Sequence, residues 1–223
     1  MQGREGAVSV FVCWPEPGRV FPSLIRRIGA EASAELYEAF IGDLAAGFPV
    51  TGVDGYLYSA DQAASFREKF PGVTVREQTG RTQGRRLHAC FEEMLADHAY
   101  AVIVGSGIPD LHPRLLRSAF QMLERRDVVV GPTDRGGLYL LGMRQPRDVF
   151  RGIRWGSGQE LPQLVRNLER AHLDYGFFPP RRKVETYEDL QSLRRRLLRP
   201  MAPLTYTQLQ LLGVPAEAGE LTL

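Results

Sequence analysis

The sequence predicts an α/β protein of one domain, with a mainly parallel β-sheet covered by helices on both faces. Strand-like segments alternate with amphipathic helix patterns along most of the chain, which is typical of parallel sheets. The apolar segments 101–104 and 128–130 are short and uninterrupted, as expected for strands buried on both faces. The pattern breaks once, where strands at 127–132 and 136–143 follow each other with only a loop between them. This break predicts a local antiparallel element.

The strands are predicted from β-branched, apolar runs that end at proline, glycine or charged residues. The first is the run AVSVFVC, which stops at the loop WPEPGR. In chain order, the predicted strands are 7–13, 55–59, 73–77, 100–105, 127–132, 136–143 and 174–178.

The helices are predicted from apolar residues that recur at helical spacing and from residues suited to helix ends. Asp61 is the expected N-cap of the second helix. Pro113 fits a first helical turn, where its missing N–H costs nothing. The segment TYED at 186–189 resembles a capping box, with Asp in place of the usual Glu. In chain order, the predicted helices are 30–46, 61–70, 85–98, 112–126, 159–172, 187–199 and 205–212.

Composition is that of a soluble globular domain. The chain has 223 residues, of which 43% are hydrophobic and 24% charged. We expect a domain over 7–199 and a tail over 200–223 that adds one short helix and then frays. The N-terminal segment lacks the features of a signal peptide, and no apolar run reaches the length of about 20 residues that a membrane span needs.

The net charge limits the classes of binding partner, and the cysteines indicate the cellular compartment. A net charge of +2 is too weak to indicate nucleic acid or a membrane as a partner. Cys13 and Cys90 lie far apart without a CxxC spacing, which favours a reducing cytoplasm and excludes a metal finger. Among the 28 basic residues only Lys69 and Lys183 are lysine, which suggests a general drift from lysine to arginine. Where a lysine is missing, this drift alone would leave an arginine in its place.

Several loops together carry a family resemblance. In order they are VFVCWPEPGRV (10–20), IGAEASAELYEAFIGD (28–43), GSGIPDL (105–111), GPTDRGGLYLLG (131–142) and VETYEDL (184–190). Over residues 7–198 the chain resembles a bacterial family of nucleotide-diphospho-sugar transferase homologues, also described as glycosyltransferase-like. The resemblance implies a GT-A, Rossmann-like fold, a first loop that cradles a nucleotide phosphate, and acidic residues that hold Mg²⁺ or Mn²⁺.

The resemblance also implies a set of site residues in this chain. A nucleotide-sugar, or another phosphorylated small molecule, is the expected ligand. The residues expected on the sugar side are Tyr139, Trp155 and Glu185. The residues expected to contact the nucleotide and its phosphates are Pro15, Gly18, Arg19, Arg86, Ser106, Asp110, Arg135, Gly136 and Gly137. The chain is free to form an oligomer.

This chain departs from the family at its charged positions and keeps the framework. Cys13 and Phe21 stand where the family has lysine, and a Lys-to-Arg drift would have kept that charge. Gly107 and Arg135 stand where it has aspartate, and Lys183 replaces another acid. The expected metal site therefore lacks its acids, and we assign no residue as a metal ligand. Cys13 is interpreted as a small buried hydrophobe.

Two of the remaining charged residues have competing interpretations. Asp110 is either a surviving metal ligand or a cap of the following helix, and the cap is favoured because one carboxylate rarely holds a divalent ion. Arg135 either grips a phosphate with both guanidinium nitrogens or pairs at the surface with Asp134. Trp155 is either a platform for a sugar ring or a packing residue.

Three functions remain open on these grounds. The first is a nucleotide-diphospho-sugar transferase with an altered, metal-independent or inactive site. The second is a pseudoenzyme that kept the scaffold as a ligand-binding or interaction module. The third is a nucleotidyltransferase, a class that shares the sheet but uses a basic N-terminal loop, which this chain lacks.

Overall fold

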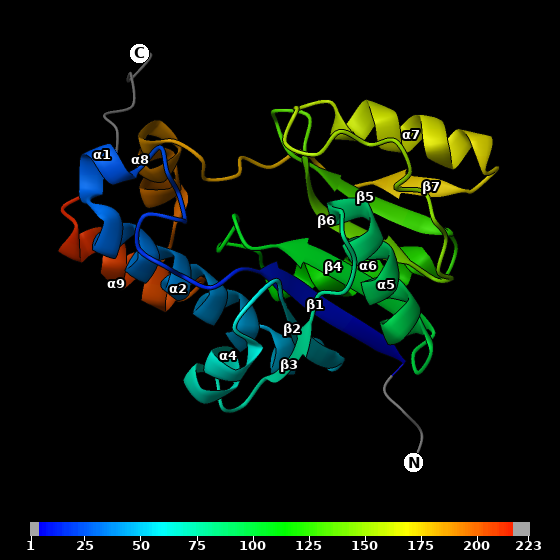
Figure 1. Cartoon of the computed structure of the whole chain (residues 1–223), viewed down its shortest axis with the longest axis horizontal. Coiled ribbons are helices and arrows are strands. Elements are labelled where there is room, and N and C mark those ends of the chain that lie inside the picture. Colours follow the sequence, from blue (N-terminus) through cyan, green and yellow to red (C-terminus); the bar gives the residue numbers. More distant parts are fainter. Residues whose placement is uncertain (1–4, 216–223) are drawn as a thin grey trace.

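The computed structural model describes residues 5–215, and within them the chain forms a single seven-stranded sheet (Figure 1). The strands are β1 (Gly6–Val12), β2 (Asp54–Ser59), β3 (Thr74–Glu77), β4 (Tyr100–Gly105), β5 (Val128–Pro132), β6 (Leu138–Met143) and β7 (Tyr175–Phe177). Their order is β3-β2-β1-β4-β6-β5-β7. β6 runs antiparallel to β4 and β5, whereas the remaining pairs are parallel. The predicted mixed α/β sheet with a local antiparallel element is confirmed.

The helices also follow the sequence patterns, with two additions. They are α1 (Ile25–Ile28), α2 (Ala30–Ala46), α3 (Phe48–Thr51), α4 (Ala63–Lys69), α5 (Gln83–Leu95), α6 (Pro113–Leu123), α7 (Glu160–Arg170), α8 (Tyr187–Arg196) and α9 (Pro203–Leu211). The sequence did not predict α1 and α3, because each is a single turn and too short to show a helical period. The capping box at Thr186 and Asp189 is confirmed.

One predicted cap is wrong. Gln62, and not Asp61, occupies the N-cap position of α4 and makes no side-chain cap. The Asp61 carboxylate instead accepts the backbone N–H of Trp14 at 2.7 Å and pairs with Arg19. Asp61 therefore ties the first loop to the end of β2.

Helices cover both faces of the sheet. Leu116, Ala119 and Leu123 of α6 share a buried cluster with residues of α2 on one face. Residues of α5 and α7, such as Phe91 and Leu164, share a second cluster on the other face. The apolar strands β4 and β5 lie between these layers, which explains why their sequences carry no polar alternation.

A third cluster joins α8 and α9 to the outer side of α2, where Figure 1 shows these helices gathered away from α7. The N-cap residue of α9 gives no side-chain hydrogen bond. Asp43 of α2 supplies the missing cap, because its carboxylate accepts the N–H of Leu204 at 3.0 Å and that of Thr205 at 2.7 Å. The helix expected in the tail is thus present and docked. The predicted boundary near residue 200 stays a prediction, and the end expected to fray lies outside the described residues.

The strand order reverses between β1 and β4, which both run in the same direction. A crevice opens outside the carboxyl ends of such strands, and ligands of α/β sheets bind there. The first loop and the loop after β4 both begin at this point. Within residues 5–215, no helix is long and apolar enough to cross a membrane.

Gly142 in β6 provides a test of the packing between the sheet and α6. A Cβ atom there would lie 2.6 Å from Val129 Cγ2 and 3.1 Å from Leu123 Cδ1. Gly142→Ala is expected to lower the free energy of unfolding by about 1–3 kcal/mol, because the core has no room for the methyl group. Urea denaturation measures the change. Gly72→Ala is the control, since nothing lies within 4 Å of its Cβ position, and a loss in the control equal to that in Gly142→Ala would contradict this packing.

Candidate functional site

A cavity of about 530 Å³ lies at the carboxyl end of β4, between the sheet and the N-terminal ends of α5 and α7. Its apolar lining includes Phe11, Leu138 and Trp155. Its charged lining comes from Arg135, Glu160, Lys183 and Glu185. The volume lies in the range usual for sites of small molecules and cofactors.

The glycine turn after β5 sets the position of the loop that closes the cavity. Gly136 has a φ of +79°, and a Cβ on it would lie 2.1 Å from the carbonyl oxygen of Gly158. Only glycine permits both the backbone conformation and this approach. The N–H of Leu161 also donates to the carbonyl of Gly136 at 3.0 Å. The turn therefore holds residues 155–158 and the first turn of α7 against the cavity.

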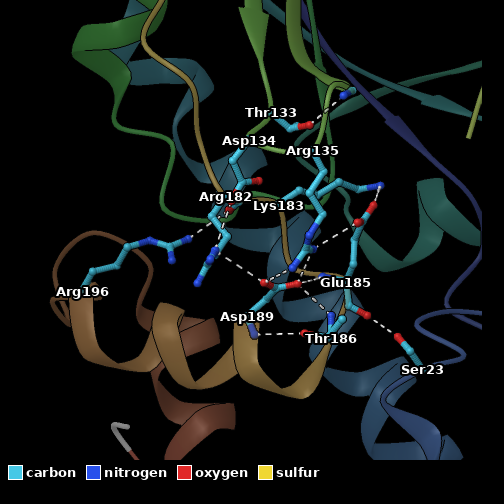
Figure 2. A network of polar contacts seen from close by, with 11 residues as sticks. Ser23, Thr133, Asp134, Arg135, Arg182, Lys183, Glu185, Thr186, Asp189 and Arg196 are labelled. Carbon is cyan, nitrogen blue, oxygen red and sulfur yellow. Dashed lines mark hydrogen bonds and ion pairs between the residues drawn. The ribbon is translucent and has the colours of Figure 1, made fainter. Parts of the chain in front are cut away.

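A buried carboxylate, Asp189 of α8, organises the polar rim (Figure 2). Its side chain is 1% exposed and accepts Arg135 Nη1 at 2.7 Å and Nη2 at 2.8 Å. It also accepts the backbone N–H groups of Glu185 and Thr186. Burial opposes ionisation of Asp189, but the hydrogen bonds from Arg135, Thr186 and Glu185 outweigh it and hold the pKa of this carboxyl below its ordinary value.

Lys183 fills the place where the resemblance leads one to expect an aspartate. A Cβ on Gly107 would lie 2.6 Å from Lys183 Cγ and 2.9 Å from its Cε, so the lysine chain covers this glycine. The N–H of Val184 donates to the carbonyl of Gly107 at 3.0 Å and fixes the two segments together. Lys183 Nζ lies 3.0 Å from Glu185 Oε1, and Arg135 Nη1 lies 3.3 Å from Glu185 Oε2.

The residues expected on the sugar side come together in the structure. Tyr139, Trp155 and Glu185 all line the cavity, as do Arg135 and Gly137. Trp155 also packs against Phe150, with ring centroids 6.3 Å apart. The Tyr139 ring lies over Gly131 and is 2% exposed, so its side chain is a core group.

Most residues expected on the nucleotide side lie outside this cavity. They are Pro15, Gly18, Arg19, Arg86, Ser106, Asp110 and Gly136. Arg19 pairs with Glu16 and Asp61, and the Ser106 hydroxyl lies 2.8 Å from that of Tyr37. Arg86 Nε donates to the carbonyl of Gly80 at 3.0 Å. Arg19, Ser106 and Arg86 thus have partners within the protein, and the role of these residues toward a nucleotide stays a prediction.

Two side-chain pairings expected from the sequence are wrong. Asp110 does not cap α6, because His112 is the N-cap and its ring nitrogen accepts the N–H of Arg114. Asp110 instead accepts Arg196 Nε of α8 at 2.8 Å. Arg135 pairs with Asp189, and Asp134 pairs with Arg182, whose Nε lies 3.2 Å away. In both cases the partner lies far along the chain.

Cys13 and Phe21, where the resemblance implies lysines, are packing residues. Burial raises the pKa of the Cys13 thiol, which fits a packing role. The Phe21 ring makes edge contacts with Tyr37 and Phe40, with centroids 5.4 and 5.5 Å away. Both positions now contribute apolar surface to the core beneath the loop.

The residues around the cavity do not fit a divalent metal ion. Mg²⁺ and Mn²⁺ need several free carboxylate oxygens, whereas Glu185 and Asp189 already accept cationic side chains. Between residues 5 and 215, no group of three His, Cys, Asp or Glu side chains is placed to hold a metal. The rim has balanced formal charges, with Arg135, Arg182, Lys183 and Arg196 facing Asp134, Glu185, Asp189 and Asp110.

Glu160 is a cavity residue that the sequence analysis missed. It is 5% exposed, and its Oε1 accepts the N–H of Ser157 at 3.0 Å. Among the described residues, its Oε2 finds no hydrogen-bond partner. A glutamate in a first helical turn is a common feature that favours the helix dipole, so the sequence carried no signal that this one is buried.

The chain is similar to one family model and to several solved structures. Residues 52–157 match a family model described as "Uncharacterized protein conserved in bacteria (DUF2064)". A protein of Desulfovibrio desulfuricans G20, provisionally assigned as a nucleotide-diphospho-sugar transferase, has 31% identity over 92% of this chain and 94% of its own, with a TM-score of 0.85. No curated protein matches the chain.

More distant structures share the fold alone. A cytidylyltransferase from Leptospira borgpetersenii has 11% identity over 96% of this chain and 97% of its own, with a TM-score of 0.58. A nucleotidyl transferase from Methanothermobacter has 16% identity over 89% of this chain and 100% of its own, with a TM-score of 0.54.

Replacing Asp189 tests whether its carboxylate holds the rim together. Asp189→Asn is expected to lower the free energy of unfolding by about 2 kcal/mol at pH 7, because it removes charge-assisted hydrogen bonds. Because the folded-state pKa is below the ordinary value of 3.8, the difference from wild type is fully present above that pH. It shrinks as the pH falls further and the carboxyl takes up its proton.

Chemical denaturation at pH 7 and at acid pH gives both values. The exposed Glu68→Gln is the control and is expected to stay within about 0.5 kcal/mol of wild type. A difference for Asp189→Asn that does not depend on pH would argue against an ionised carboxylate at this position.

Proposed function

Because the chain belongs to the same bacterial family as the Desulfovibrio nucleotide-diphospho-sugar transferase homologue, we propose that it binds a nucleotide-diphospho-sugar and supplies the positive charge at the diphosphate from its own side chains. In this proposal the protein is a transferase whose site works without a divalent metal. The observation that carries it is Lys183, which lies over Gly107 and brings an ammonium group to the cavity.

The charge requirement of the reaction supports this arrangement. Transfer of the sugar breaks the bond between its anomeric carbon and a phosphate oxygen, and the electron pair leaves with the nucleoside diphosphate. The anomeric carbon forms its new bond to the oxygen of an acceptor hydroxyl or of water, which loses its proton. A cation must stabilise that leaving group. Lys183 and Arg135 both line the cavity, and their side chains are 45% and 43% exposed. They are therefore open to a ligand.

The carboxylate that now holds these cations can be displaced. Glu185 is 45% exposed and accepts both Lys183 and Arg135. A diphosphate carries more negative charge and more acceptor oxygens than one carboxylate, and guanidinium groups match phosphate geometry. Asp189 keeps its hold on Arg135 from the buried side, so the guanidinium stays in place when Glu185 swings away.

The sugar is proposed to occupy the cavity next to these cations. Trp155 and Leu138 give an apolar wall suited to the face of a pyranose ring. Glu185 also lines the cavity. Tyr139 contributes by holding the strand that forms the floor, as its buried ring indicates.

Two other functions are weighed against this one. A pseudoenzyme would bind the same ligand without turnover, and the paired state of every rim cation is the observation that favours it. A nucleotidyltransferase receives no support from the first loop, because Arg19 there is engaged by Glu16 and Asp61.

The two lysines of the chain allow a direct test. A bound nucleotide sugar, UDP-glucose or GDP-mannose, is expected to protect Lys183 from chemical acetylation and to leave Lys69 unprotected. The two side chains are similarly exposed, at 45% and 36%. At a ligand concentration about ten times Kd, labelling of Lys183 should slow about tenfold. Mass spectrometry of the two peptides reads both sites in one sample.

The metal requirement is read in the same experiment, run with EDTA and with Mn²⁺. Protection of Lys183 that appears only with Mn²⁺ contradicts a metal-free site, and absence of protection by both nucleotide sugars contradicts the ligand class.

Replacing Lys183 separates the transferase from the pseudoenzyme. Lys183→Gln is expected to abolish the rise in melting temperature that a bound nucleotide sugar produces, and to abolish release of UDP or GDP from it. Lys69→Gln should leave both unchanged, because Lys69 pairs with Glu38 on another face. Ligand binding by the wild type without release of nucleoside diphosphate, in water and with added alcohols as acceptors, would favour the pseudoenzyme.

A further inference from the structure

We propose that Glu160 recognises the sugar, by accepting a hydrogen bond from one of its hydroxyl groups at Oε2. This inference rests on the proposed function in one respect: it assumes that the ligand of the cavity contains a sugar. It assigns the recognition to a residue that the family resemblance did not indicate.

The first support is the unfilled hydrogen-bonding capacity of this carboxylate. Glu160 lines the cavity and is 5% exposed. Oε1 accepts the N–H of Ser157 at 3.0 Å, while Oε2 is buried and finds no partner among residues 5–215. Buried polar atoms are almost always satisfied, because an unmet one costs about 1–3 kcal/mol. A group that enters the cavity is the natural source of the missing donor.

The second support is charge. The rim carboxylates, such as Glu185 and Asp189, each have a cationic partner within 4 Å, whereas Glu160 has none in the described part of the chain. An ionised carboxyl only accepts hydrogen bonds. Its position in the first turn of α7, which has 11 residues, stabilises the negative charge without using Oε2. Oε2 of Glu160 is thus an acceptor without a donor in the described part of the chain.

The third support is the rigidity of its surroundings. Ser157 and Gly158 belong to the loop that the close approach of Gly136 fixes in place. The Ser157 hydroxyl donates to the carbonyl of Arg154, which closes the loop on itself. A binding group that is held by its backbone in this way selects a ligand by position, since it cannot follow a hydroxyl that points elsewhere.

The neighbours of Glu160 determine the class of donor. Trp155 and Leu138 offer apolar surface, whereas the cations Lys183 and Arg135 occupy the rim. A pyranose ring presents both an apolar face and hydroxyl groups at its edge. The ring can therefore contact the indole while one hydroxyl donates to Oε2, and this hydrogen bond to a charged acceptor is stronger than a neutral one.

The test compares Glu160→Gln with Glu169→Gln, which changes an exposed glutamate at the other end of the same helix. Glu160→Gln keeps the shape and an acceptor for Ser157 but removes the charge. Saturation-transfer NMR measures binding of free glucose, which needs no nucleotide site. Calorimetry measures binding of UDP-glucose and GDP-mannose, and of UDP and GDP.

Glu160→Gln is expected to weaken glucose, UDP-glucose and GDP-mannose binding by about tenfold or more, with UDP and GDP unchanged. Glu169→Gln should match the wild type for all five ligands. Equal affinity of wild type and Glu160→Gln for the sugars overturns the inference and leaves the proposed function standing. Wild-type binding of glucose but of no nucleotide, with loss in Glu160→Gln, supports the inference and overturns the proposed function. Absence of any binding to the wild type overturns both.

Discussion

The polar rim of the cavity depends on one buried carboxylate, Asp189. Removing a carboxylate from water is costly unless its oxygens receive several donors, and Asp189 receives Arg135 twice and two backbone N–H groups. The donors come from the glycine turn after β5 and from the segment that leads into α8. One ionised group thereby joins a turn of the sheet to the C-terminal helices and sets where both sides of the rim lie.

The charged side chains of the rim form a mutually paired set. Lys183 occupies the space that Gly107 leaves open, and it pairs with Glu185. Arg135 pairs with Glu185 as well and reaches Asp189 behind it. These cations and acids neutralise each other within the rim.

Local patterns in the sequence predicted most of the fold but few of the ion pairs and hydrogen bonds at the site. Strands and long helices were found because burial repeats along each of them, and the antiparallel element because one connection is short. The position of β6 between β4 and β5 has no local signal. Neither do the partners of Arg135 and Asp110, which lie 54 and 86 residues away. The sequence did not indicate the role of Glu160, because burial of a glutamate at the start of a helix depends on the loop packed against it.

The dependence of α9 on Asp43 bears on how the chain folds. The two hydrogen bonds that begin this helix span 161 and 162 residues. A nine-residue helix is marginal in isolation, so α9 gains its stability only after α2 has formed and the C-terminal segment has emerged. Contacts of such long sequence separation are slow to close. We expect the last part of the chain to dock late during synthesis, onto α2, which the earlier residues have already formed.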